Sequence, residues 1–157
     1  MVKTSTFLLS AAIVVALNHA TSCQSVPLST EPTDPVLAES AKLFQGPVKS
    51  VLEHRCIHCH HAYAANGGLN FQDRELVFRG DTKGPYVVPG KPNQSRIWDA
   101  IFPPMKHPKV MPADGWGMNS SEHAAFLKWI ETGAYWPEGR DGKLKIRNYE
   151  VEIEDYL

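Results

Sequence analysis

The sequence predicts a small, mainly α-helical domain with long loops and room for one short β-hairpin. Two observations support this fold class. Apolar residues recur at helical spacing before residue 56 and again after residue 119, and the stretch between them is interrupted by glycine and proline. Of the 157 residues, those left after a leader and a spacer suffice for one modest core and not for two.

The first predicted helix leads toward residue 56. Pro47 suits the first position of a helix, and an apolar stripe with helical spacing begins directly after it at Val48 and continues through Val51 and Leu52. The following segments, residues 67–71 and 84–90, contain too much glycine and proline for helix, so we expect loops there with a short hairpin.

Two further helices are predicted. A brief one should begin at Ser95 as its N-cap and end before Pro103. The last helix has the clearest signals, because Asn119 and Glu122 have the spacing of a capping box and Gly133 marks the end. Its apolar stripe consists of Phe126, Leu127 and Ile130.

Residues 56–60 read C-x-x-C-H, the spacing of covalently attached c-type haem. Cys56 and Cys59 would lie on one side of a turn, where each thiol can form a thioether to a haem vinyl carbon, and His60 would then offer its imidazole to the iron. Zinc held by these cysteines and nearby histidines, in a small binding module, is the alternative. A thioredoxin-like redox site would need a βαβ setting, and the sequence supplies none.

Residues 1–22 have the features of a signal peptide: a basic Lys3, an apolar run over residues 7–17, and small residues at Ala20 and Ser22. Haem is attached to C-x-x-C-H on the oxidising side of a membrane. The leader and the motif together predict an exported, periplasmic protein.

The third cysteine, Cys23, stands where a lipoprotein carries its lipidated residue. A diacylglycerol thioether on Cys23 would anchor the protein to a membrane, and it would account for a thiol without a partner. Ordinary cleavage after Ser22 remains open, because Ala20 occupies a position where leucine is usual. Residues 23–36 are rich in proline, serine and threonine and are predicted to be a linker.

The folded domain is predicted to span residues 37–137, followed by a charged tail, residues 138–157, to which the sequence assigns no role. The formal net charge of −1 argues against nucleic acid as a partner, since that would require a basic face.

Residues 44–137 also resemble a known family. The shared features are, in order, the motif 56–60, Gly67-Gly68-Leu69, Pro89-Gly90-Lys91-Pro92 with Ser95, Met111-Pro112, Trp129-Ile130, Gly133-Ala134 and Trp136-Pro137. They are similar to the planctomycete-type cytochrome c domain. The resemblance implies a class I cytochrome c-like fold, in which the N- and C-terminal helices cross around one haem c, and an exported electron carrier with His/Met ligation of the iron. The chain departs from the usual Met-Pro-Pro by reading Met111-Pro112-Ala113.

Met111 is the predicted distal iron ligand. It lies between the haem motif and the last helix, and Pro112 stiffens the loop that must hold its sulfur against the iron. Met105 and His107 are the next candidates, and ligation by His107 would give bis-histidine coordination.

Apolar side chains should surround the haem and keep water from the iron. The candidates for this wall are Phe71, Tyr86, Val87, Trp98, Ile101 and Phe126. Basic side chains that could pair with the haem propionates are Arg55, Arg79 and Lys91.

These observations lead us to expect a monohaem c-type cytochrome that carries single electrons between redox proteins, such as a dehydrogenase, an oxidase or another cytochrome, and that is not itself an enzyme. Three alternatives stay open. They are a haem-based sensor or catalyst with an open sixth position, a fixed electron-transfer subunit of a larger oxidoreductase complex and, least favoured, the zinc-stabilised module.

Overall fold

The computed structural model describes residues 32–102, 110–113 and 117–147. The predicted signal peptide, Cys23, Met105, His107 and the end of the tail lie outside these ranges. Within the described ranges, no helix combines the length and the apolar character that crossing a membrane requires.

The chain is helical from residue 35 to residue 56, through α1 (Pro35–Leu43), the wide-turned η1 (Phe44–Val48), α2 (Lys49–Val51) and η2 (Leu52–Cys56). The helix predicted to open at Pro47 thus opens earlier, at Pro35. There the Asp34 side chain accepts hydrogen bonds from the first free N–H groups. The helix bends near Gly46, where φ is −101° and ψ −109°, because Pro47 has no N–H to donate.

A two-stranded antiparallel hairpin follows the helix, formed by β1 (His60–His61) and β2 (Ala64–Ala65). It confirms the expected short hairpin but lies earlier than residues 67–71. Next come η3 (Asn66–Gly68), α3 (Arg74–Arg79) and η4 (Pro92–Gln94). The sequence analysis did not predict α3, which Asp73 caps through the N–H of Leu76.

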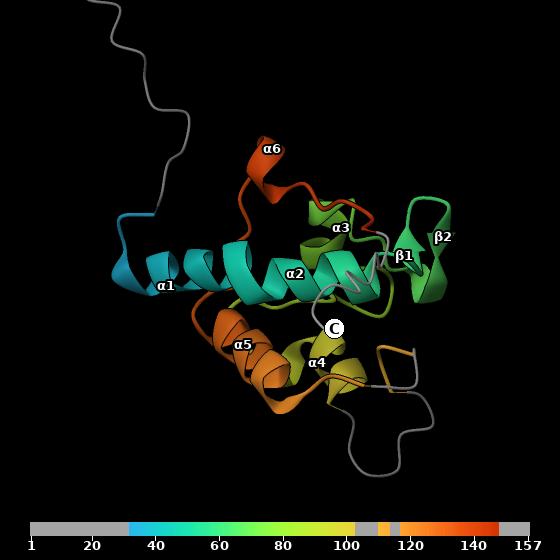
Figure 1. The fold of residues 1–157 in the computed structure, drawn as a ribbon. Coiled ribbons are helices and arrows are strands. Elements are labelled where there is room, and N and C mark those ends of the chain that lie inside the picture. Colours follow the sequence, from blue (N-terminus) through green and yellow to red (C-terminus); the bar gives the residue numbers. More distant parts are fainter. Residues whose placement is uncertain (1–31, 103–109, 114–116, 148–157) are drawn as a thin grey trace, which may run out of the picture. The chain divides into compact units, whose positions relative to one another are not determined.

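The later helices are α4 (Arg96–Ile101), α5 (Ser120–Glu131) and α6 (Gly139–Gly142). Both hydrogen bonds of the predicted capping box form at the start of α5, between Asn119 and Glu122. Helix α5 packs against α1 and η1, so the N- and C-terminal helices meet as predicted (Figure 1). The turn after α5 needs glycine, because Gly133 has φ +106° and a Cβ there would lie 2.7 Å from Cδ2 of Leu37.

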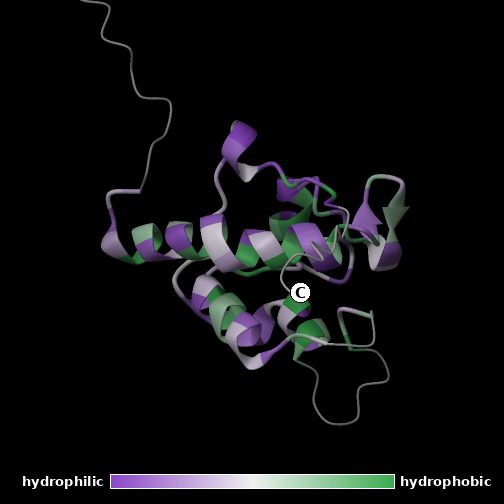
Figure 2. Cartoon of the chain, viewed as in Figure 1, coloured by the Kyte–Doolittle hydropathy of each residue, from purple (hydrophilic) through white to green (hydrophobic). Residues whose placement is uncertain are grey.

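The helices turn their apolar sides inward to form one core cluster (Figure 2). Phe44 is its aromatic centre, since its ring lies 4.8 Å from that of Trp136 and 6.1 Å from that of Trp129. In α5, Trp129 is buried beside the predicted Phe126 and Ile130, whereas Leu127 is only half-buried. The described residues therefore form the mainly α-helical small domain with a short hairpin that the sequence predicts.

Residues 138–147, placed after the domain in the sequence analysis, pack against it. The indole Nε1 of Trp136 donates to the carbonyl of Gly142 at 2.7 Å, and Leu144 is buried in the core cluster. The segment then runs along the helix toward β1 (Figure 1).

Candidate haem site

The haem motif begins where the long helix ends. The N–H of Ile57 still donates to Leu52 as in a helix, at 2.9 Å, and the chain then tightens. In this tighter part the N–H of Cys59 donates to Cys56 and that of His60 to Ile57, both at 3.2 Å. Cys56 is buried and Cys59 is exposed. One thiol thus belongs to the core and the other faces solvent, within one turn of chain.

His60 lies in β1, and its ring is half-buried. The N–H of Phe71 donates to the His60 carbonyl at 2.9 Å, and the Phe71 ring stands edge-on to the imidazole at 5.8 Å. The Nδ1 atom is buried and makes no hydrogen bond to any described residue. A buried ring nitrogen without a partner calls for one, and an imidazole nitrogen is a good ligand for haem iron. The residues present therefore fit a haem.

Burial lowers the pKa of His60, and the nearby backbone of Asn66 and Leu69 offsets part of that effect. A lowered pKa keeps the imidazole neutral, and the neutral imidazole is the form that binds a metal ion.

Met111 lies against the core. Its N–H donates to the carbonyl of Ala100 in α4 at 2.9 Å, and its half-buried side chain packs against the cluster that contains Cys56. The structure places Met111 on the same apolar cluster as the haem motif, and its ligation of iron stays a prediction. The other candidate ligands, Met105 and His107, lie outside the described residues.

Four other histidines form hydrogen bonds within the protein. His123 Nε2 lies 2.9 Å from the carbonyl of Ile101, at the end of α4. His58 is 2.8 Å from the carbonyl of Arg147. His54 bonds the backbone one turn earlier, and His61 accepts from the next turn of the hairpin. Within the described ranges, no three His, Cys, Asp or Glu side chains gather around a common point.

The six predicted wall residues all lie in or against the core cluster: Phe71, Tyr86, Val87, Trp98, Ile101 and Phe126. Tyr86 has an additional role, because its hydroxyl donates to Asp81 at 2.8 Å and lies 3.0 Å from the carbonyl of Gly67. Arg96 covers the Tyr86 ring at 4.3 Å and pairs with Asp81 at 2.7 Å. This network ties the loop after the haem motif to α4.

The network also shifts two pKa values. Hydrogen bonds from the Lys83 N–H and the Tyr86 hydroxyl lower the pKa of Asp81, and Arg96 adds to that effect. Burial raises the pKa of Tyr86, and the neighbouring Asp81 carboxylate raises it further. Tyr86 therefore stays a neutral hydrogen-bond donor.

Of the basic residues considered for the propionates, Arg55 is bound inside the protein. Its Nη1 pairs with Glu122 at 2.8 Å, and its Nη2 donates to the carbonyl of Gly117. This contact joins the helix that enters the motif to the start of α5. Arg79 and Lys91 are exposed.

Ser95 has a use that the sequence analysis missed. It occupies the N-cap position of α4, as predicted, but its side chain makes no capping bond. The buried hydroxyl instead accepts from the N–H of Val88 at 2.9 Å and donates to the carbonyl of Lys91 at 3.0 Å. It thus holds the Pro89–Pro92 turn, which explains why a serine follows that turn.

Glu53 is the second such residue. It is 3% exposed, and its carboxylate accepts hydrogen bonds from the Lys145 N–H and the Arg147 side chain, which lie more than ninety residues later in the chain. No local pattern marks it, since a glutamate within a helix usually faces solvent. The only available signal was its position on the helix, directly after the buried Leu52 and three residues before the buried Cys56. The apolar stripe of that helix was recognised.

Comparison with known proteins matches this site to one family. Residues 56–115 match the family model described as Planctomycete cytochrome C. No curated protein and no solved structure matches the chain. A cytochrome c domain implies covalently bound haem c and suggests electron transfer rather than catalysis. The match supports a planctomycete-type cytochrome c domain at residues 56–115, from the first cysteine of the haem motif to beyond Met111.

Proposed function

We propose that this chain is a monohaem c-type cytochrome that carries one electron at a time between redox partners outside the cytoplasmic membrane. The observation that carries the proposal is the environment of His60. Its imidazole is half-buried, its Nδ1 makes no hydrogen bond to a described residue, and it directly follows Cys59, the second cysteine of the C-x-x-C pair, in a segment that matches a cytochrome c family.

Each residue of the site has a distinct task in this proposal. Cys56 and Cys59 hold the porphyrin through thioethers, His60 supplies the proximal nitrogen and Met111 supplies the distal sulfur. When bound, the haem provides the iron that gains or loses a single electron. The apolar cluster around Cys56 and Phe71 excludes water from that side of the site.

The surroundings of the domain extend the proposal. A signal peptide over residues 1–22 would export the chain to the periplasm, and a lipidated Cys23 would hold it at a membrane. The partners would be redox proteins: a dehydrogenase, an oxidase or another cytochrome. A carrier needs an accessible edge for such partners, and Cys59 is exposed.

A redox titration of the mature protein, expressed with c-haem maturation, tests the proposal. We expect a single one-electron transition, and no spectral change when carbon monoxide is added to the ferrous protein. Ready carbon monoxide binding would contradict the carrier, because it requires an open sixth position, and it would indicate a sensor or a catalyst. A colourless protein that contains zinc would indicate the binding module.

A further inference from the structure

We propose that residues 138–147, here called the strap, position the haem motif through Glu53 and Arg147. The strap and Glu53 both lie outside residues 56–115, which match the cytochrome c family. The link from the strap to the haem rests on the proposed function. The contacts between the strap and the rest of the polypeptide do not depend on that function.

The first half of the strap is fixed to the domain. Leu144 is 7% exposed, and the Trp136 indole bonds the carbonyl of Gly142. Lys49, on the long helix, donates to the carbonyl of Asp141 at 2.6 Å. No side chain fits at Gly142, because a Cβ would lie 1.8 Å from the carbonyl oxygen of Pro137. The strap therefore approaches the helix along a defined path.

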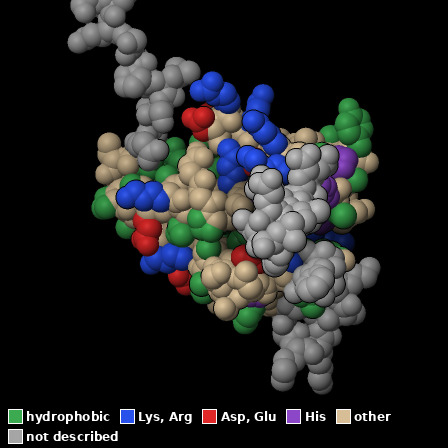
Figure 3. Space-filling view, in the orientation of Figure 1, with side chains coloured by type: hydrophobic (Ala, Val, Ile, Leu, Met, Phe, Trp, Pro, Cys, Tyr) green, Lys and Arg blue, Asp and Glu red, His purple; other side chains and the backbone are tan. Residues whose placement is uncertain are grey.

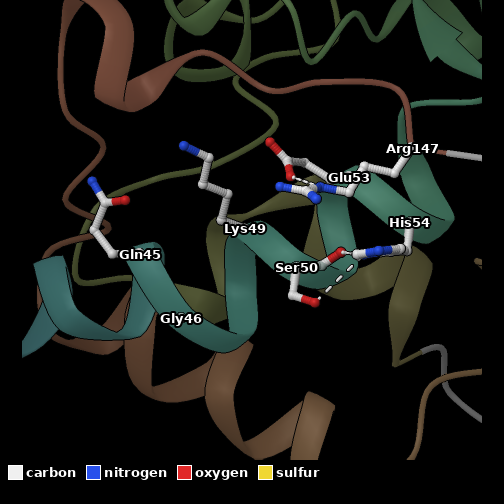
Figure 4. Close-up of a pocket in the computed structure, with 7 residues that line it drawn as sticks. All are labelled: Gln45, Gly46, Lys49, Ser50, Glu53, His54 and Arg147. Atoms are coloured by element: carbon white, nitrogen blue, oxygen red, sulfur yellow. Dashed lines mark hydrogen bonds and ion pairs between the residues drawn. The ribbon is translucent and has the colours of Figure 1, made fainter.

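The second half of the strap binds Glu53. Oε1 of Glu53 accepts from the N–H of Lys145 at 3.0 Å, and Oε2 accepts from Nε of Arg147 at 2.7 Å. The backbone joins as well, since the N–H of Arg147 donates to the carbonyl of Glu53 at 3.4 Å. Figure 4 shows the two side chains in contact, and both line a pocket of about 340 Å³. A carboxylate that is 3% exposed needs such partners, because an unpaired buried charge is costly.

The end of the strap reaches the haem motif itself. The carbonyl of Arg147 lies 2.8 Å from Nε2 of His58, which is one of the two residues between the motif cysteines and directly precedes Cys59. Glu53 precedes Cys56 by three residues on the same helix. Arg147 thus contacts the chain at Glu53, before Cys56, and at His58, after it.

The outer face of the strap is basic. Lys143 and Lys145 are exposed. Gly142, which precedes Lys143, and Leu144, which lies between the two lysines, are buried. Figure 3 shows Lys and Arg side chains gathered over α6 and the segment that follows it. The strap thus adds positive charge beside the motif. That charge bears on a haem potential, because nearby cations destabilise the more charged ferric form.

The test compares strap variants with matched controls in the protein loaded with haem. Arg147→Ala removes the ion pair to Glu53, and a chain ending at Leu144 removes all of the strap's contacts with Glu53 and His58. Arg140→Ala removes the same charge from an Arg side chain that is 97% exposed, and a chain ending at Arg147 keeps the strap whole. Arg147→Lys keeps the charge and should recover part of the effect.

Two readouts are needed. Amide hydrogen exchange over residues 53–60 should become about tenfold faster or more in both strap variants, and it should not change in the controls. The midpoint potential should fall in the strap variants and stay unchanged in the controls. Exchange and potential that match the controls would overturn the proposal. Faster exchange with an unchanged potential would also overturn it, because the strap would then hold the chain without positioning the haem.

The same measurements separate this proposal from the proposed function. If the chain attached no haem, the proposed function would fail, and exchange in the haem-free full chain would still decide whether the strap holds residues 53–60. Equal exchange in variants and controls there would reject the strap as well.

Discussion

At the scale of single residues, the site depends on how a few side chains are presented by the turn after the long helix. The spacing of Cys56, Cys59 and His60 alone was sufficient to predict a haem motif, because that chemistry is local in sequence. The contacts of Tyr86 with Asp81 and Arg96 were not predictable, because they depend on how the irregular segment 81–86 turns and meets α4. Spacing carries no information about such pairs.

Met111→Ala should open the sixth position of the iron. The ferric protein should lose the weak charge-transfer band near the infrared that a Met–iron bond produces, and the ferrous protein should bind carbon monoxide. Absorption spectra with and without carbon monoxide measure both. Met118→Ala is the matched control, since Met118 also packs, partly buried, against the core and should keep the band. A band that survives Met111→Ala would transfer the ligand role to another methionine, Met105 first.

Gly80→Ala should destabilise the protein more than Gly90→Ala does. Both glycines have a positive φ, +75° and +74°, and Gly80 combines it with a ψ of −161°, a region essentially restricted to glycine. A Cβ at Gly80 would lie 2.0 Å from the carbonyl oxygen of Gly84, whereas nothing lies within 4 Å at Gly90. Urea unfolding of both variants measures the difference in unfolding free energy. Equal losses of this free energy would show that the backbone near Gly84 can shift with little loss of stability.

At the scale of elements, the long helix shows which signals suffice. Its second half follows from the apolar stripe after Pro47. Its first half was missed, although Asp34 followed by Pro35 is a strong start signal, because the surrounding residues look like a linker in composition. Helix α5 was predicted almost to the residue, since its cap, stripe and terminal Gly133 all agree.

Replacing Glu122 should cost more than replacing Asn119, although both belong to the same capping box. Asn119→Ala removes one capping bond, worth about 1 kcal/mol. Glu122→Ala also removes the ion pair to Arg55, whose side chain is only 13% exposed, so we expect a loss of about 2 kcal/mol. Thermal unfolding of the two variants provides the comparison. Equal losses would mean that the Arg55 contact contributes nothing to stability.

The joint between the strap and the helix should weaken in acid. Burial raises the pKa of Glu53, but hydrogen bonds from Arg147 and Lys145 and the charges of Arg147 and Lys49 outweigh it, so the pKa falls below its ordinary value of 4.5. A lowered folded-state pKa stabilises the protein above the ordinary pKa. This stabilisation is lost as the pH falls through the folded value.

The unfolding free energies of the wild-type protein and Glu53→Gln should therefore differ most above pH 4.5 and converge in stronger acid. Urea unfolding over a pH series measures this. Glu138→Gln is the control, because Glu138 is 86% exposed in its pair with Arg74 and should make a small difference at every pH. A Glu53→Gln difference that does not change with pH would contradict the lowered pKa.

At the scale of the whole molecule, the fold class and the position of the motif were predictable, and the extent of the packed chain was not. The segment 138–147 reads as a charged tail, because only Leu144 among its residues is a buried large apolar side chain. Its attachment depends on Glu53, ninety-odd positions earlier in the sequence. Such distant pairing is visible only once the chain is folded.

The measurement that tests the central claim most directly is an optical spectrum of the protein expressed with c-haem maturation and then denatured. We predict that the haem remains with the chain and that the ferrous form shows the α-band of a c-type haem with two thioether bonds. The Cys56→Ser and Cys59→Ser double variant should lose that colour. A wild-type protein that releases its haem on denaturation, or that never acquires haem, would contradict the account.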